Sequence, residues 1–296
     1  MDARALERTR PPLHAVVGVR AAFALLVALV LGTGLAGGLL RAGVALPPFP
    51  GMAQAVVLHA ALMMSGFFGT VIGIERAVSL KRPAGFAVPL LSALAAVALW
   101  GGQTAAGSAL GMLAATGFVA MNIVIVRRQP AFHTCLLGLG ALAWWCGQAA
   151  FALGGIGSAA IAWWAAFLVL TVVAERLEMT RLMRRRPGAQ ASLQGSVALL
   201  SAGAALSATW PAAGSVVFGA ALAALALWLL CFDIARRTVR TSGLSRYMAV
   251  CLLSGHAWLL VAGVAWAALG LGQATRDLAL HALGLGFLFG MVMGHA

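Results

Sequence analysis

Charged residues are scarce in this chain of 296 residues: they make up 9% of it, and only seven are Asp or Glu. Soluble domains carry about 25% charged residues, so this composition excludes an ordinary soluble protein. Hydrophobic residues make up 62% and gather into long apolar runs. Runs of about twenty such residues cross a bilayer as helices. We therefore expect an all-α fold, a polytopic transmembrane helix bundle forming a single domain over residues 1–296.

Cysteine is also rare, and its spacing excludes the common metal motifs. None of the four cysteines forms a C-x-x-C pair, and all lie in apolar segments. They are expected to be small buried residues rather than metal ligands. The four are Cys135, Cys146, Cys231 and Cys251.

The shortage of acidic residues leaves a net charge of +13, which by itself would suggest a nucleic-acid partner. However, the basic residues fall almost entirely in every second loop, the pattern that orients membrane proteins with positive loops inside. With a cytoplasmic N-terminus, all but two of the twenty Lys and Arg lie on the cytoplasmic side. The exceptions are Arg41 and Arg276. We predict a multi-pass protein of the cytoplasmic (inner) membrane, with the lipid bilayer and no nucleic acid as partner.

Ten apolar segments are long enough to be predicted as spans. They are about 18–40, 54–75, 86–103, 107–126, 132–153, 157–175, 193–210, 213–232, 248–270 and 278 to the end. The first is longer than a signal-peptide core and is expected to be retained. The last span ends without a basic flank, so we expect the natural chain to continue for about two more spans.

Two histidines are predicted near the outer ends of their spans. On a helix rising about 1.5 Å per residue, His59 lies roughly 8 Å below the outer end of the second span. By the same rise, His281 lies roughly 5 Å below that end of the tenth. Histidines at matched depth on two helices can ligate haem iron through their ring nitrogens. Gly66 and Gly284 are expected on the histidine-bearing sides of these helices, where they would leave space for a porphyrin.

A second metal site is a further expectation. His295 follows His281 by fourteen residues, nearly four helical turns, and projects to about the same face. His133 is expected at about the depth of His295, and His256 near the middle of the membrane. For each of these inner histidines, a hydrogen bond to a neighbouring carbonyl remains the alternative.

Carboxylates are absent from the middle of the predicted spans, which excludes a proton relay of the pump type. Four acidic residues lie at cytoplasmic helix ends beside arginines, where surface ion pairs worth little energy would account for them. These are Glu75, Glu175, Glu178 and Asp233.

Two stretches carry a resemblance to known families. They are LHAALMMSGFFGTVIGIERAVSL around His59, and LHALGLGFLFGMVMGHA around His281 and His295. Histidines on the second and tenth spans resemble the low-spin haem site of heme-copper oxidase subunit I, and the chain is similar to the NnrS-like membrane proteins. The resemblance implies about twelve spans, haem b as cofactor and His59 and His281 as its axial ligands. It does not extend to the copper site, because spans six and seven contain no histidine.

Three functions remain open from the sequence. The first is a haem b membrane protein for electron transfer or nitric-oxide handling, with a redox partner or quinone. The second is a cofactor-free transporter of a small molecule, against which the lack of a mid-span proline or a clear repeat counts. The third is a structural subunit. Arg41 or Arg276 could pair with haem propionates.

Overall fold

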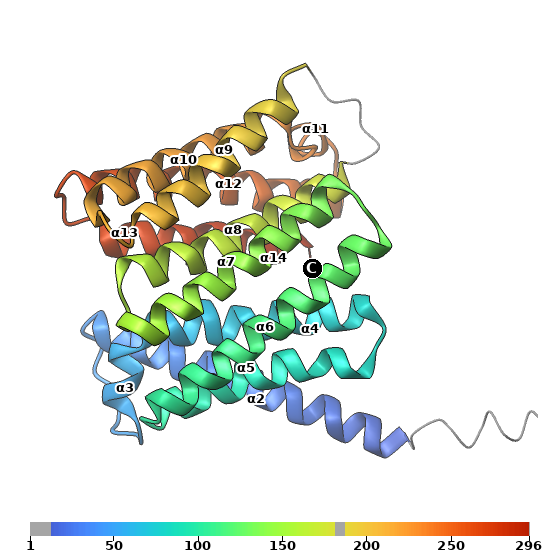
Figure 1. The fold of residues 1–296 in the computed structure, drawn as a ribbon. Coiled ribbons are helices and arrows are strands. Elements are labelled where there is room, and N and C mark those ends of the chain that lie inside the picture. Colours follow the sequence, from blue (N-terminus) through green and yellow to red (C-terminus); the bar gives the residue numbers. More distant parts are fainter. Residues whose placement is uncertain (1–12, 181–186, 296) are drawn as a thin grey trace, which may run out of the picture. The chain divides into compact units, whose positions relative to one another are not determined.

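The structure, a computed structural model, describes residues 13–180 and 187–295, with side chains described between residues 21 and 294 (Figure 1). It confirms the all-α fold. Nine helices among the described residues are long and apolar enough to cross a membrane. The helices are α2 (Leu13–Arg41), α3 (Met52–Val57), η1 (Ala61–Phe67), α4 (Phe68–Leu80), η2 (Pro83–Phe86), α5 (Ala87–Trp100), α6 (Thr104–Arg128), α7 (Phe132–Gly154), α8 (Ser158–Met179), α9 (Ala189–Leu206), α10 (Pro211–Phe232), α11 (Ala235–Thr238), α12 (Gly243–Gly270), α13 (Arg276–His281), η3 (Ala282–Leu288) and α14 (Phe289–His295).

The chain divides into two compact units, with the boundary after Ala114 within helix α6. Each unit has its own packed helices. Several sequence predictions fall outside the described residues: the cytoplasmic N-terminus, the basic loop near residue 184 and the side chain of His295. The single domain over residues 1–296 stays a prediction.

In the first unit, the continuous helix formed by η1 and α4 lies at the centre. Its η1 part contacts both α2 and α5, and its α4 part contacts α5. The hydroxyl of Thr70 on α4 donates to the carbonyl of Gly66 at 2.6 Å, and that of Ser92 on α5 donates to the carbonyl of Ser65 at 3.1 Å, so these buried hydroxyls are satisfied. The unit therefore places the segment after His59 against two neighbouring helices.

In the second unit, α8 is the central helix, and most of its residues are buried. An aromatic cluster joins it to its neighbours: Trp144 of α7 stacks on Phe167 of α8 at 5.1 Å, and Phe118 meets Trp144 edge-on at 5.2 Å. Helices α10 and α12 approach closely at glycines. A methyl group added to Gly263 would lie 2.5 Å from the backbone nitrogen of Ala223. Such small-residue contacts are how membrane helices pack.

Helix α9 shows where the expected ten spans and the observed nine differ. It corresponds to the predicted span 193–210, and it forms a hairpin with α10, to which Trp228 ties it by donating to the carbonyl of Ala189 at 2.7 Å. Its sequence carries three serines and two glutamines, which lower its hydropathy below that of the other long helices.

Large apolar side chains lie exposed along several helices, among them Leu25 at 71% and Val264 at 60%. In water such exposure would be costly, whereas lipid tails accept it. Together with the nine apolar helices, this makes the protein a multi-pass membrane protein. The four cysteines form no disulfide, and each is exposed or half-exposed, like the large apolar side chains on the helices. The expectation that they are buried is therefore wrong.

Candidate functional site

His59 lies between helix α3 and the π-helical segment η1, and its half-buried ring packs against α2. Its Nδ1 lies 2.8 Å from the carbonyl oxygen of Gly34. Because a carbonyl only accepts hydrogen bonds, this contact assigns the proton of the neutral ring to Nδ1 and the lone pair to Nε2. A methyl group added to Gly38 would lie 2.7 Å from Cε1 of the ring. The glycine therefore gives the imidazole room to reach α2.

His281 is the last residue of helix α13, and the π-helical segment η3 begins directly after it. Its ring is exposed, and its Nδ1 lies 2.8 Å from the carbonyl oxygen of Asp277, one turn earlier on the same helix. This contact assigns the same tautomer as in His59. Nε2 of His281 is therefore also the basic nitrogen of its ring.

The two histidines share a local setting that reading the sequence at a helical period did not reveal. Each lies in the tripeptide Leu-His-Ala, followed by a π-helix of seven residues that ends immediately before Phe68-Gly69 in one case and Phe289-Gly290 in the other. π-Helical turns are rare and occur frequently at functional sites. The sequence did contain a signal: in both stretches the tripeptide Leu-His-Ala is followed by the dipeptide Phe-Gly. The separation between the two motifs is one residue longer in the first stretch than in the second.

The two glycines predicted to make room for a porphyrin differ in the structure. A methyl group added to Gly66 would lie 2.8 Å from Cβ of Ala96 and 3.4 Å from Val30, so the interpretation of Gly66 as an open slot is wrong. That interpretation considered the helix of Gly66 alone, whereas side chains of α2 and α5 fill the point beside it. Gly284 has no atom within 4 Å of the corresponding point, and the space beside it is open.

The pairing of His59 with His281 stays a prediction, because His59 belongs to the first unit and His281 to the second. Among the described residues, no three His, Cys, Asp or Glu side chains gather as ligands for a metal ion. A haem iron needs only two axial protein ligands, so its binding does not depend on such a cluster.

The second metal site expected from His133, His256 and His295 stays a prediction, because the side chain of His295 lies outside the described residues. His133 is buried at the start of α7. His256 is fully buried on α12, with no hydrogen-bond partner at either ring nitrogen, and its Nε2 lies 4.0 Å from Oδ2 of Asp233. A ring enclosed in this way does not offer a face to a porphyrin. For His256, the structure therefore favours neither of the two expectations, a haem ligand or a hydrogen bond to a neighbouring carbonyl.

Asp233 belongs to a buried ion pair that the sequence did not predict. Nε of Arg176 donates to Oδ2 of Asp233 at 2.6 Å, and a second guanidinium nitrogen donates to Oδ1 at 2.7 Å. The side chains are only 6% and 1% exposed, so the expectation of a surface pair is wrong for Asp233. The pair joins the end of α8 to the end of α10, beside His256. Glu75, in contrast, pairs with Arg76 at 2.7 Å while itself exposed, as expected.

The charge of Arg176 decides the protonation of this carboxylate, which follows the last residue of α10. Burial by itself raises the pKa of Asp233. The two hydrogen bonds and the positive charge of Arg176, with the N–H of Ala235 at 2.8 Å, outweigh burial and hold that pKa below its ordinary value. The pair is therefore ionised near neutral pH, and its charges cancel within the bundle.

Comparison with known proteins places the chain in a family without assigning an activity. The profile of a family described as a domain of unknown function (DUF8744) matches residues 20–296, and the chain belongs to this family. No curated protein matches the chain. No solved structure matches it.

Proposed function

We propose that this member of the DUF8744 family is an integral membrane protein that binds one b-type haem, with His59 and His281 as axial ligands. The function we infer is electron transfer or nitric-oxide handling, with a quinone or another redox protein as partner. The observation that carries the proposal is the shared setting of the two histidines. In each, Nδ1 contacts a backbone carbonyl at 2.8 Å at the entrance to a π-helix.

This hydrogen bond is what a metal-ligating histidine needs. Ligating imidazoles almost always donate their other ring N–H to a carbonyl or carboxylate, which fixes the tautomer and makes the ligating nitrogen more basic. Gly34 and Asp277 supply these carbonyls through their backbones. The side chain of Asp277 takes no part in its bond. A methyl group added to Gly34, in contrast, would lie 2.5 Å from Sδ of Met63, so the bond to His59 also depends on close packing at Gly34.

The surroundings of the two histidines fit the group in part. The open space beside Gly284 would admit the edge of a porphyrin next to His281, whereas Gly66 contributes none. Arg41, at the end of α2, follows Gly38 by three residues and so lies about one turn beyond the position that the ring of His59 contacts. It is our candidate partner for a propionate. When bound, a bis-histidine haem supplies reversible one-electron exchange.

The orientation is part of the proposal. With the N-terminus in the cytoplasm, the loop after α4, the loop after α6 and the ends of α8 and α10 face inward with their arginines, as the positive-inside rule favours. His59 and His281 then lie near the outer face of the cytoplasmic membrane. Labelling of a cysteine introduced at Arg128, in a variant whose four native cysteines are replaced by alanine, checks this. It should react only when the reagent enters the cell, and reaction from outside would reverse the topology.

The test is a reduced-minus-oxidised absorption spectrum of protein purified after expression with ample haem. The wild type should show a low-spin b-type signal. His59→Ala and His281→Ala should each remove it or make it high-spin, because one axial ligand is lost. His133→Ala, a buried histidine in another helix, is the matched control and should leave the spectrum unchanged. A wild type without haem, or a signal that survives both substitutions, would contradict the proposal.

A cofactor-free transporter is the second candidate, and the two π-helical segments are the observation that favours it. Departures from regular helix in a span often line a substrate path. The same spectrum separates the candidates, since a transporter without cofactor would show no haem signal while remaining folded.

A further inference from the structure

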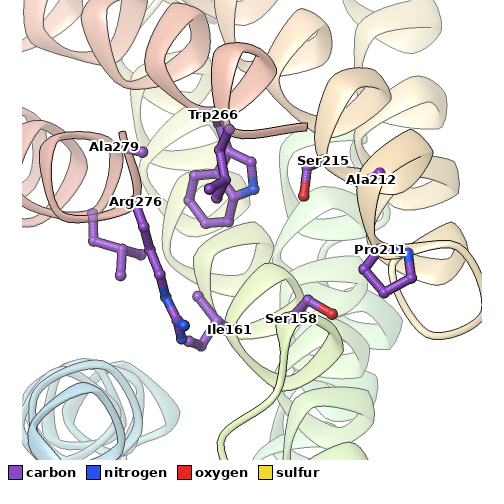
Figure 2. Close-up of a pocket in the computed structure, with 10 residues that line it drawn as sticks. Ser158, Ile161, Pro211, Ala212, Ser215, Trp266, Arg276 and Ala279 are labelled. Carbon is purple, nitrogen blue, oxygen red and sulfur yellow. The ribbon is translucent and has the colours of Figure 1, made fainter. Parts of the chain in front are cut away.

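A cavity of about 310 Å³ lies in the second unit, at the end where α8 and α10 begin and α12 ends (Figure 2). Its walls come from four helices: Ser158 and Ile161 of α8, Pro211 and Ser215 of α10, Trp266 of α12, and Arg276 of α13. Arg276 and Ser158 are exposed, so the cavity reaches the surface of the unit. It lies at the end of the unit opposite the Arg176–Asp233 pair.

The polar groups of this cavity are mostly donors. Figure 2 shows the guanidinium of Arg276 beside Ile161, and the indole nitrogen of Trp266 directed toward Ser215. Trp266 is 4% exposed and Ser215 is 6% exposed, so both are held by packing. Trp266 is fixed further by its ring contact with Phe218, at 4.7 Å between centroids. An arginine guanidinium and an indole N–H donate hydrogen bonds and cannot accept them.

Apart from Ser158, the remaining lining residues are apolar, and none of the described residues that line the cavity is acidic. The donors therefore face no carboxylate of the cavity itself. A concave site with an apolar body and a few convergent polar groups is the usual form of a small-molecule site. Its positive charge selects for an anion, and its apolar walls select for an anion that carries a hydrocarbon part.

We propose that this cavity binds an amphiphilic oxyanion, a carboxylate or phosphate on an apolar body, with Arg276 as the charged contact and Trp266 and Ser215 as the orienting donors. At about 30 Å³ of liquid volume per water, the cavity holds roughly ten waters. This volume suits the head and first part of a medium-length chain, and it is too small for a whole phospholipid. The ligand is either a free carboxylate or the headgroup of an anionic lipid.

This inference does not rest on haem binding. Every wall of the cavity belongs to the second unit, and neither histidine of the proposed haem site lines it. It assigns Arg276 to the ligand of the cavity and leaves Arg41 for a propionate. A substitution of Arg276 therefore tests the cavity without removing Arg41, the candidate partner of a haem propionate.

The test is calorimetric titration of the full chain in neutral phosphatidylcholine nanodiscs with octanoate, and with octanamide as the uncharged probe of the same length. We expect octanoate to bind and octanamide to bind at least about tenfold more weakly, since it lacks the charge-assisted bond. Arg276→Gln should weaken octanoate about tenfold or more, and Trp266→Phe, which keeps the ring and removes the N–H, by several-fold. Arg240→Gln, an exposed arginine at the other end of the unit, is the matched control and should change nothing.

Two further arms complete the design. Phosphatidylglycerol added to the nanodiscs should compete with octanoate if the natural ligand is a lipid headgroup, and should leave octanoate binding unchanged if it is a free carboxylate. Equal binding of octanoate and octanamide would overturn the proposal. So would an Arg276→Gln protein that binds octanoate like the wild type, whether or not its haem spectrum changes. A wild type that binds octanoate but no haem would leave this inference standing and refute the proposed function alone.

Discussion

Loss of one partner of the Arg176–Asp233 pair should destabilise the protein far more than loss of both. Arg176→Met leaves the Asp233 carboxylate buried and charged, with the N–H of Ala235 as its remaining hydrogen bond. Breaking a buried pair in this way costs about 3–5 kcal/mol. At about 1.4 kcal/mol per factor of ten, the unfolding equilibrium shifts roughly a thousandfold. Asp233→Asn should cost somewhat less, because its amide oxygen still accepts a hydrogen bond.

The double variant should recover most of this loss, because it removes both charges together. The assay is a double-mutant cycle of reversible unfolding in mixed micelles, in which the coupling free energy should reach at least about 2 kcal/mol. Two single variants that each cost less than about 1 kcal/mol, and that add in the double variant, would refute the inference of a buried pair.

The same pair predicts a pH dependence with a definite sign. Because the folded-state pKa of Asp233 is depressed, its stabilising effect is fully present above the ordinary carboxyl pKa of about 3.9. It is lost as the pH falls from there through the lower folded-state pKa. The stability of the wild type relative to the double variant should therefore fall only under acid conditions. A fall that sets in near neutral pH would contradict the assignment.

Three further outcomes follow from the histidine and glycine positions. His256→Leu removes two buried ring nitrogens that have no hydrogen-bond partner. The free energy of unfolding should therefore stay unchanged or rise by about 1–3 kcal/mol. A large decrease in that free energy would show that the fold needs the ring. Gly38→Ala should displace the ring of His59 and so lower the haem content, which is measured by absorption. Gly32→Ala, on the same helix with open space around it, is the control and should leave the haem content unchanged. Equal effects of the two substitutions would contradict the packing of His59 on α2. Gly284→Ala should leave the fold intact and lower haem content, because it fills the open space beside His281; unchanged haem content would place the porphyrin elsewhere.

The fold could be predicted from the sequence because the burial of apolar side chains in a membrane depends on composition and length. Helix α9 marks the limit of that reasoning: its serines bond to carbonyls of their own helix, as Ser196 does to Ser192, so a helix of lower hydropathy still packs beside α10. Its packing against α10, rather than its own composition, explains why α9 belongs to the bundle.

The candidate site could be predicted only in those features that depend on a single segment of the sequence. His281 lies within the apolar helix Arg276–Gly294, as predicted, whereas His59 precedes the apolar helix Ala61–Leu80 and so lies outside the span in which it was predicted. The slot at Gly66 was wrong because Val30 of α2 and Ala96 of α5 fill it, and the sequence of its own helix indicates neither neighbour. The ion pair was missed because Arg176 and Asp233 are 57 residues apart on different helices, and nothing local in either segment indicates the other.

Near-infrared magnetic circular dichroism of the oxidised wild-type protein tests the proposed haem site most directly, because the position of its charge-transfer band distinguishes pairs of axial ligands. We predict the band of a bis-histidine haem, replaced in both His59→Ala and His281→Ala by that of a haem with a single histidine. A folded wild type with no haem band, or with a band of a different ligand pair, would contradict the assignment of these two histidines.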